Sequence, residues 1–424
     1  MAVAWARPHC AVAVARVTQS LFARCKPLVV RILGAAVVGV IGGILAALFL
    51  GSLNWAGTTR VEHGWLVWLL PIGGLLVGLS YHYFGQPIAG GTSLVLDAVR
   101  VPDGEVPGRM APMIWSGSVV SHVVGASVGR EGAAVQIVSS VTDDAARRLR
   151  ISRDTRCVLL VCAVAAAFGG LFGVPVAGGF FALEVQRESR RHLSTLPFAI
   201  GSSIIANAVA HATGIDHDRP FRIDELGLGW ADLWRYLVAA VFFGVVAAVF
   251  IKVEHAMKKL FTRFVSTPPL RPMIGGVCVI GLIAMAGTRD YLGVSFDLVE
   301  VALTGAAGIA AAAFIWKIAF TTVSLGSGFV GGEMLPLFVI GALAGAQFAR
   351  VTDASVPLFA ALGLVAVFAA AAKTPIACVV IGIELFGWTG VPAYVAVCVV
   401  AVLASGRPSI YPPSPLATRT TENR

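Results

Sequence analysis

Long runs without a charged side chain limit the possible folds of this chain more than any other feature. Residues 32–59 and 63–96 contain no Asp, Glu, Lys or Arg, and similar runs follow along most of the sequence. Hydrophobic residues make up 57% of the 424 residues and charged residues only 13%, which is not the balance of a soluble domain. In a bilayer, spanning segments must satisfy their backbone hydrogen bonds as helices or closed barrels. Because these runs lack the alternation of barrel strands, the sequence predicts an all-α polytopic membrane protein.

The basic residues are concentrated in short segments beside the apolar runs. The net charge of +9 is by itself also compatible with nucleic-acid binding. A nucleic-acid surface would place basic and aromatic side chains together on one module, and the sequence has no such module, so we expect no nucleic-acid partner. The clusters instead follow the positive-inside rule, by which Lys and Arg mark cytoplasmic loops. They lie at 16–31, 147–156, 187–191 and 252–271.

Placing these clusters in the cytoplasm predicts a path through the bilayer. The N-terminal segment 1–28 and the tail 412–424 are expected on the cytoplasmic side, and the acidic loop 214–229 on the opposite side. The N-terminal segment lacks the charged, apolar and small-residue order of a removable signal peptide, so none is expected. The expected membrane segments are 32–55, 65–83, 110–128, 131–142, 157–186, 193–212, 233–251, 273–288, 301–325, 336–349, 358–372, 374–385 and 391–404.

Several of these segments are too short or too interrupted to cross the bilayer as one helix. Segment 131–142 is expected to begin partway through the membrane, since a full span needs about 20 residues. Segment 157–186 lies between two basic clusters, so it is expected to enter and leave on the same side as a hairpin of two half-length helices. The residues expected to break it are Gly169, Gly170, Gly173 and Pro175.

The sequence contains no pattern typical of a metal site or of an intramembrane enzyme. Its seven cysteines lie mostly within apolar runs and lack the spacing of metal ligands. We therefore expect no metal and no cofactor. There is no H-E-x-x-H motif, and no serine nucleophile motif with a histidine partner. These absences favour a transport protein over an enzyme.

The second half of the chain repeats the first. Residues 165–185 and 365–385 align at a constant offset of 200, and the alignment pairs a phenylalanine, a proline and a glutamate. Coincidence in an apolar sequence is the alternative explanation, but a paired proline and a paired intramembrane glutamate favour a repeat. The sequence therefore predicts two homologous halves, 29–213 and 230–411. Inverted repeats with short, broken helices are typical of transporters whose site lies between the repeats.

Two glycine-rich breaks carry an acidic residue at matching places. The first is Gly-Ala-Ser-Val-Gly-Arg-Glu-Gly-Ala-Ala-Val-Gln at 125–136, and the second is Gly-Ser-Gly-Phe-Val-Gly-Gly-Glu-Met-Leu-Pro at 326–336. Glycine lets a backbone approach a ligand closely. Each break precedes an expected helix start, whose free N–H groups and positive dipole end favour an anion. Two such ends together predict an anion site.

Glu131 has two possible roles at this site. An ionised carboxylate would compete with the anion and a protonated one would withdraw, which would couple anion movement to protons. Alternatively, Glu131 forms a structural ion pair with Arg130, since charges within a membrane need partners. We favour the functional role because ionisable groups within a membrane are functional by default.

The residues of these breaks resemble the motifs of a known family. Gly-Arg-Glu-Gly-Ala-Ala-Val-Gln at 129–136 is similar to the GREGxxVQ motif of the CLC chloride channel and transporter family, and Gly-Gly-Glu-Met-Leu-Pro at 331–336 resembles its second selectivity stretch. Tyr411 matches the family's C-terminal tyrosine. The resemblance covers nearly the whole chain. It implies the CLC-type fold of two inverted repeats with short, tilted helices, and a homodimer with one pore in each subunit.

Departures from the chloride-transporting members point to one branch of that family. Chloride members carry a coordinating serine in a stretch that here reads Gly-Gly-Thr-Ser-Leu at 90–94, and Val185 stands where chloride–proton antiporters have an internal glutamate. Together with the segment 106–112, His122 and Glu333, these features resemble the bacterial fluoride–proton antiporter branch. This resemblance implies export of fluoride in exchange for protons across the bacterial inner membrane. A chloride channel or chloride–proton antiporter of the same fold is the alternative.

The resemblance also implies roles for individual residues. Glu131 would be the gating and proton-transfer group, and Glu333 a second acidic group of the coupled pathway. Thr92 and Ser93 have two possible roles, donation of a hydrogen bond to fluoride or capping of a helix that begins near Leu94. The expected anion-binding residues are Thr92, Ser93, Gly129, Arg130, Gly132, Ala133, Met334, Leu335 and Tyr411.

Two roles are possible for His122. It precedes the first glycine-rich break on an expected outward-crossing helix, so it is placed to relay protons at a suitable pH. A histidine in such a position is more often hydrogen bonded in the core.

Overall fold

The structure is a computed structural model that describes most of the chain. The described residues are 8–88, 90–100, 104–186, 193–215, 233–306, 308 and 310–411, and for residues 8–27 and 87 the description covers the backbone alone. The predictions for the basic cluster 187–191 and for the tail 412–424 fall largely or wholly outside these residues, as does most of the acidic loop 214–229.

The described part of the chain is helical and contains no β-strand. The α-helices are α1 Pro8–Glu62, α2 Leu70–Phe84, α3 Thr92–Arg100, α4 Met110–Val124, α5 Glu131–Arg148, α6 Arg153–Phe172, α7 Pro175–Glu184, α8 Leu196–Ala212, α9 Leu233–Phe264, α10 Leu270–Ala286, α11 Phe296–Thr304, α12 Ala313–Ser327, α13 Met334–Thr352, α14 Val356–Ala372, α15 Pro375–Phe386 and α16 Val391–Ala404. Short 3₁₀ helices are η1 Gly64–Leu69, η2 Gln86–Ile88, η4 Leu193–Thr195 and η6 Trp388–Gly390. The predicted all-α class is confirmed.

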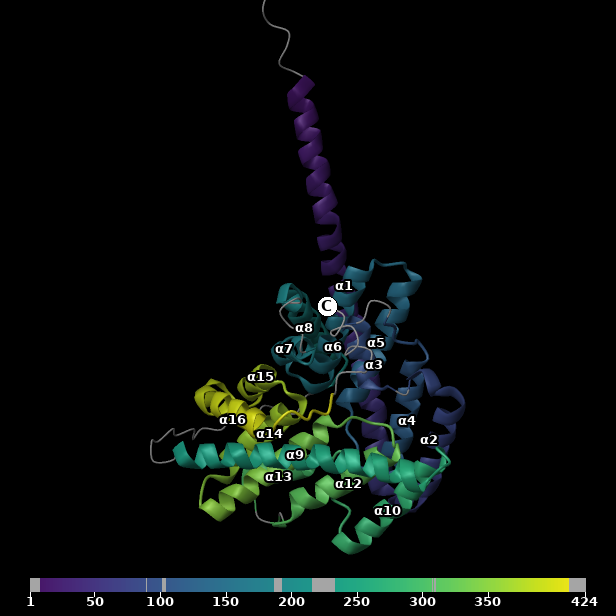
Figure 1. Ribbon diagram of the computed structural model, residues 1–424, viewed down its shortest axis with the longest axis vertical. Helices are drawn as coiled ribbons and strands as arrows, with labels where there is room; N and C mark the ends of the chain where they lie inside the picture. The colour runs from purple at the N-terminus through teal and green to yellow at the C-terminus, as the bar shows by residue number, and fades with distance from the viewer. Residues whose placement is uncertain are drawn as a thin grey trace, which may run out of the picture.

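The helices form two groups with the same internal arrangement. In the first half α1, α6 and α8 pack against one another, and in the second half α9, α14 and α16 do the same. Figure 1 shows α6, α7 and α8 at one end of the body and α9, α12 and α13 at the other. The order of long, short and broken helices repeats from α1–α8 to α9–α16. The predicted fold of two inverted repeats is therefore confirmed.

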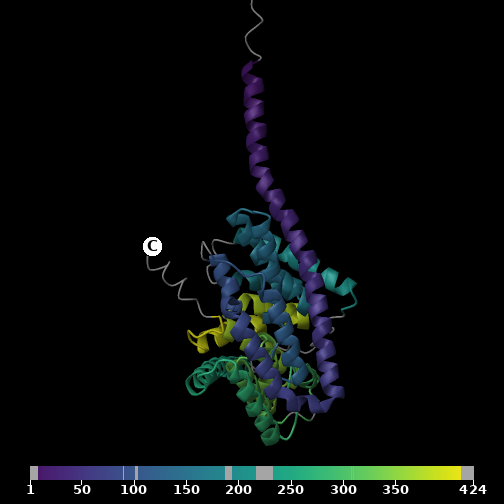
Figure 2. The same ribbon diagram turned by 90° about the vertical axis from the view of Figure 1, so that its right-hand side faces the viewer.

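Helix length and exposure separate an inner layer from an outer one. Six helical segments are long and apolar enough to cross a membrane, and α6 and α13 are among those that lie mostly buried within the protein. Helix α1 runs along the side of the body and continues across residue 28 without a break (Figure 2). Its surface exposes leucine and valine, and Trp55, Trp65 and Trp68 are exposed near its end and in η1. This pattern is typical of a lipid-facing helix that ends at a membrane interface.

The inner helices approach closely because their contact residues are small. Helix α14 is buried from Leu358 to Ala372, and seven of these fifteen residues are alanine. A Cβ atom at Gly341 of α13 would lie 2.2 Å from the carbonyl oxygen of Gly363 in α14, so the two backbones touch at this point. Without a hydrophobic driving force in lipid, such close packing of small residues is what holds membrane helices together.

Three expected segments differ from the helices that form in their place. The segment 157–186 breaks at Gly173 and Pro175 as expected, since Gly173 has a φ of 74° and α7 begins at Pro175. Its first helix, α6, is not half-length, because it has 20 residues and continues through Gly169 and Gly170. Helix α9 does not end at residue 251 but continues to Phe264 through the basic cluster, because Lys, Arg and Glu are good helix formers. The apolar run 301–325 is divided between two helices, α11 and α12. Hydropathy marks where the bilayer ends, not where a helix does.

Two glutamates join the repeats through reciprocal contacts. Glu384 of α15 accepts hydrogen bonds from the backbone N–H groups of Val176 and Ala177 at the start of α7, at 3.0 and 2.8 Å. Glu184 of α7 accepts the matching pair from Ile376 and Ala377 at the start of α15, also at 3.0 and 2.8 Å. Each carboxylate thus satisfies helix-start donors that have no partner within their own helix. Both glutamates therefore have a structural role.

Replacing Glu384 with alanine should destabilise the protein by about 2 kcal/mol, because two buried N–H groups lose a charged acceptor. Thermal unfolding of the purified protein in detergent, followed by tryptophan fluorescence, measures the effect. Glu384→Gln is the matched control, since it keeps one acceptor oxygen and should lose less stability. An alanine variant that unfolds at the wild-type temperature would contradict this role.

Candidate functional site

The two glycine-rich breaks pair with each other at the centre of the molecule. The Gly129 N–H donates to the carbonyl oxygen of Gly332 at 2.7 Å, and the Gly332 N–H donates to the carbonyl oxygen of Gly129 at 2.7 Å. Helix α5 begins two residues after Gly129, and α13 begins two residues after Gly332. The pairing therefore holds two helix N-termini side by side, which combines their positive dipole ends in one place.

This pairing requires glycine. A Cβ at Gly332 would lie 2.7 Å from the backbone nitrogen of Gly132, and a Cβ at Gly331 would lie 2.4 Å from the Cβ of Val128. Real Cβ atoms do not approach other atoms so closely, so any larger residue would force the two helix starts apart. The motif glycines are thus explained by backbone contact between the repeats, together with the access that they leave at the helix starts.

Glu131 places its carboxylate over the start of its own helix. The side chain is buried, and its Oε2 accepts from the backbone N–H of Arg130 at 3.3 Å, while its Oε1 lies 3.5 Å from Arg130 Nε. The ion pair required by the structural role is therefore present. The carboxylate also occupies the position that an anion would take at a helix N-terminus, as the gating role requires.

Glu333 lies at the start of α13 and is directed toward α9. It precedes the first residue of that helix and interacts electrostatically with Glu254 and Lys258 of α9. Glu254 is the residue here that the sequence reasoning missed. Its signal was its position as the single carboxylate within the basic segment 252–263. Three charged groups from two helices thus gather around the second glycine-rich break.

Thr92 lies beside the first turn of α5. Its hydroxyl oxygen accepts a hydrogen bond from Gln136 Nε2 at 3.1 Å, and a Cβ at Gly132 would lie 3.7 Å from it. Helix α3 begins at Thr92 itself and not near Leu94, so neither Thr92 nor Ser93 holds the capping position that precedes a helix. The Thr92 hydroxyl keeps its own hydrogen for donation, which leaves it able to bind an anion at the helix start.

Tyr411 packs within an aromatic cluster between the repeats. Its ring contacts Phe181 with centroids 6.5 Å apart, and Tyr411 interacts electrostatically with both Glu131 and Glu333. The cluster was not predicted, although the paired phenylalanines of the repeat belong to it. It consists of Phe168, Phe172, Phe181, Phe338, Phe368 and Tyr411, joined by ring contacts of 4.8 to 6.5 Å. Met334 and Leu335, which begin α13, are fully buried near it.

Lys317 is a buried residue that the sequence reasoning missed altogether. It lies on α12 with no exposed surface, and its ammonium lies within 3.1 Å of four oxygens. An ammonium has three N–H donors, so four acceptors share three hydrogens. One acceptor is Ser127 Oγ in the first glycine-rich break, and the others come from the segment 291–295. These acceptors are Ser127 Oγ, Ser295 Oγ and the carbonyl oxygens of Tyr291 and Gly293.

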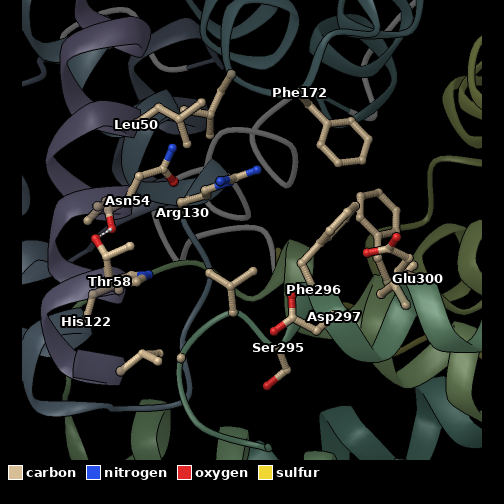
Figure 3. Close-up of a pocket in the computed structure, with 18 of the residues that line it drawn as sticks. Leu50, Asn54, Thr58, His122, Arg130, Phe172, Ser295, Phe296, Asp297 and Glu300 are labelled. Carbon is tan, nitrogen blue, oxygen red and sulfur yellow. Dashed lines mark hydrogen bonds between the residues drawn. The ribbon is translucent and has the colours of Figure 1, made fainter. Parts of the chain in front are cut away.

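A cavity opens beside the first break (Figure 3). Its volume is about 1220 Å³, and its walls are the last part of α1, the helix α11 and the segment 293–295 that Lys317 holds. Arg130 extends into it from the start of α5, and Phe172 and Phe338 of the aromatic cluster form part of its lining (Figure 3). The cavity thus adjoins Arg130, the residue that precedes Glu131.

Comparison with known proteins agrees with this geometry. Residues 73–406 match the model of the voltage gated chloride channel family. The chain is 36% identical over 381 residues to a chloride/fluoride channel protein of Pseudomonas syringae pv. tomato, covering 89% of this chain and 84% of that one. It is 25% identical to the H(+)/Cl(-) exchange transporter ClcA of Salmonella arizonae, covering 87% and 84%. The crystal structure of a CLC-type fluoride/proton antiporter superposes with a TM-score of 0.86 at 29% identity, covering 91% and 98%.

Replacing Gly332 with alanine should abolish ion transport and reduce stability by about 1 to 3 kcal/mol, because the new Cβ overlaps the backbone of Gly132. Ion flux from proteoliposomes and thermal unfolding measure the two effects. Gly281→Ala is the matched control, since a Cβ there meets no atom within 4 Å. Wild-type flux in Gly332→Ala would show that the helix starts do not need this contact.

Replacing Lys317 with methionine should destabilise the protein by about 3 kcal/mol, because buried oxygens lose their shared donor. The exposed Lys259 of α9 provides a control of equal charge change in Lys259→Met, which should unfold as the wild type does. Thermal unfolding in detergent measures both. Equal stability of the two variants would contradict a structural role for Lys317.

Proposed function

Because the chain belongs to the CLC family of voltage-gated chloride channels, we propose that it exports fluoride from the cell in exchange for protons. It is a multi-pass membrane protein of that family. Support for fluoride comes from two relatives, the Pseudomonas protein named as a chloride/fluoride channel and the solved fluoride/proton antiporter. The departures from the chloride pattern at residues 90–94 and at Val185 favour the same substrate.

The position of the Glu131 carboxylate is the observation that carries the proposal. Ionised, it occupies the paired helix starts, accepts from the Arg130 N–H and excludes an anion. Once it takes up a proton it loses its attraction to these dipoles, so a fluoride ion can replace it. The anion and the proton-bearing carboxylate therefore exchange places, which couples one movement to the other.

The anion site of this mechanism lies where the two helix starts meet. Its residues are proposed to be Thr92, Ser93, Gly129, Arg130, Gly132, Ala133, Met334, Leu335 and Tyr411. Fluoride is small and a strong hydrogen-bond acceptor, which suits the backbone N–H groups of a helix start and the Thr92 hydroxyl.

Glu333 would supply the second half of the proton path. Val185 cannot carry a proton, so the internal route of chloride antiporters is missing. Glu333 lies at the start of the other paired helix and interacts with Glu254 of α9. The charged end of α9 belongs to a basic cluster placed in the cytoplasm by the positive-inside rule, so this pair of carboxylates lies on a short route to that side.

The remaining features follow from the family and the charge pattern. We place the protein in a bacterial inner membrane as a homodimer, with the segment 1–28 and the tail 412–424 in the cytoplasm and the loop 214–229 outside. The halves 29–213 and 230–411 are the repeats. Its function is transport and not enzymatic catalysis.

Chloride transport is the second candidate. The 25% identity to an H(+)/Cl(-) exchange transporter and the word chloride in the name of the Pseudomonas relative support it. Flux from proteoliposomes loaded with fluoride or chloride, with and without a proton gradient, separates the candidates. Uphill fluoride movement driven by protons, with little chloride flux, is the expected result.

Replacing Glu131 with glutamine should reduce proton-driven fluoride transport by about a hundredfold or more, because the amide keeps the shape of the side chain but cannot transfer a proton. Fluoride release measured with an ion-selective electrode under an imposed pH gradient tests this. Glu105→Gln removes a carboxylate that is 57% exposed and pairs with Arg147, and should transport normally. Unchanged proton-driven flux in Glu131→Gln would refute the proposed mechanism.

A further inference from the structure

The charged residues that line the cavity beside Glu131 differ in sign with their exposure, since the carboxylates are exposed and the cations are more deeply buried. Glu62, Asp297 and Glu300 line it as exposed residues, whereas Arg60 and Arg130 are half-buried and His122 is only 4% exposed. Figure 3 shows Arg130 reaching into the cavity and Asp297 and Glu300 across it on α11. Water screens the exposed carboxylates within about 8 Å, while the buried cations act in a medium of lower dielectric constant.

Arg60 passes close to two glycines, Gly125 and Gly293, where a side chain would meet it. A Cβ at Gly125 would lie 3.2 Å from Arg60 Cδ, and a Cβ at Gly293 would lie 3.3 Å from Arg60 Nη2. Both glycines have positive φ angles, 92° and 61°, so the backbone on each side also disfavours a side chain. Within the described residues, the buried Nε of Arg60 has no hydrogen-bond partner. The exposed Asp297 attracts it only through the electrostatic field.

Arg130 carries a second incompletely paired guanidinium into the same cavity. Its Nε is 3.5 Å from Glu131 Oε1, beyond a good hydrogen bond, and is buried without a hydrogen-bond partner among the described residues. When Glu131 leaves the helix start, as the proposed function requires, Arg130 loses this contact as well. Arg60 and Arg130 then both face the cavity with a buried donor that has no acceptor among the described residues.

His122 completes the set from α4. Its Nδ1 lies 2.8 Å from the carbonyl oxygen of Ser118, and since a carbonyl only accepts, Nδ1 carries the hydrogen. The other ring nitrogen, Nε2, is buried and has no partner in the described part of the chain. His122 also interacts electrostatically with Arg60, Arg130 and Lys317. Three cations therefore act electrostatically on one buried ring.

Unpartnered buried donors are costly, and a ligand that accepts from them removes that cost. The ligand must be an anion because the donors belong to cations. It must also be small and of single charge, because Glu62, Asp297 and Glu300 around the same cavity repel a polyanion. A halide meets these conditions.

We propose that the interior of this cavity, between Arg60 and Arg130 and beside His122, is a second binding site for a small monovalent anion. It shares Arg130 with the proposed site at the paired helix starts but takes its other donor from Arg60, and its role in transport rests on the proposed function. An anion leaving the helix starts passes to Arg60 before it reaches solution, and one arriving from solution is held there before Glu131 yields its place.

Transport kinetics test this role. Halide flux is measured in proteoliposomes as the concentration on the cavity side is varied, with fluoride and chloride as the probes. Arg60→Met should raise KM about fivefold, the effect of removing one partly exposed charge contact, while kcat stays near the wild-type value. Arg60→Lys should restore most of the affinity because it keeps the charge.

Arg289→Met is the matched control. Arg289 donates to the carbonyl oxygen of Gly64 from an exposed position and does not line the cavity, so the variant loses the same charge near the end of α1 and should keep the wild-type KM. An Arg60→Met protein with unchanged KM, or with reduced kcat alone, would overturn the proposal. An equal rise of KM in Arg289→Met would show that the effect comes from general surface charge, and this too would overturn the proposal.

Bromide binding tests the site without relying on transport. Crystals of the full chain grown in sodium bromide should show an anomalous scattering peak between Arg60 and Arg130, and Arg60→Met crystals should lack it. No peak in the wild type, or a peak that persists in the variant, would overturn the site. If the wild type carries neither fluoride nor chloride, the proposed function fails, and the bromide result still decides whether the cavity binds an anion.

Discussion

The reciprocal hydrogen bonds between Gly129 and Gly332 are the contact on which the rest of the structure depends. A bilayer offers no water to backbone groups, so irregular chain at membrane depth must find its partners within the protein. Here the two breaks satisfy each other at 2.7 Å in both directions. The same contact brings the starts of α5 and α13 together. Pairing the breaks therefore satisfies their backbone groups and also forms the proposed anion site.

Inverted symmetry explains why this solution occurs in pairs. Two repeats of one fold present the same groups to each other across the interface, so each contact has a counterpart. Glu184 accepts from the start of α15 while Glu384 accepts from the start of α7, with the same distances. The symmetry is broken where the chemistry requires it. Glu131 is covered by its own helix start and beside a cation-lined cavity, whereas Glu333 is directed toward the charged residues of α9. Two related carboxylates thus serve opposite ends of one proposed path.

Buried and half-buried cations organise the surroundings of that path. Lys317 ties the segment 291–295 to Ser127 through neutral oxygens, and so fixes the wall of the cavity to the break that carries Glu131. Arg60 and Arg130 face the cavity with buried nitrogens that lack hydrogen-bond partners among the described residues. Desolvated cations whose donors lack acceptors are costly, and an anion bound at the proposed second site would lower this cost.

The sequence by itself determined the helical membrane class, the repeat, and the two breaks with Glu131 and Glu333, because hydropathy, glycine content and internal similarity are local properties of the chain. It did not determine the length of α6, which was expected to be a half-length helix, or the end of α9, since apolar length does not define helix length. Only the tertiary structure decided which groups meet. Lys317 and Ser127 are 190 residues apart, and Thr92 and Gln136 are 44 apart. The sequence around each of these residues does not identify its partner. The proximity of Arg60 to Gly125 and Gly293 and the electrostatic interaction of Glu333 with Glu254 likewise arise from helix packing, which depends on the shapes of distant surfaces and not on any local pattern.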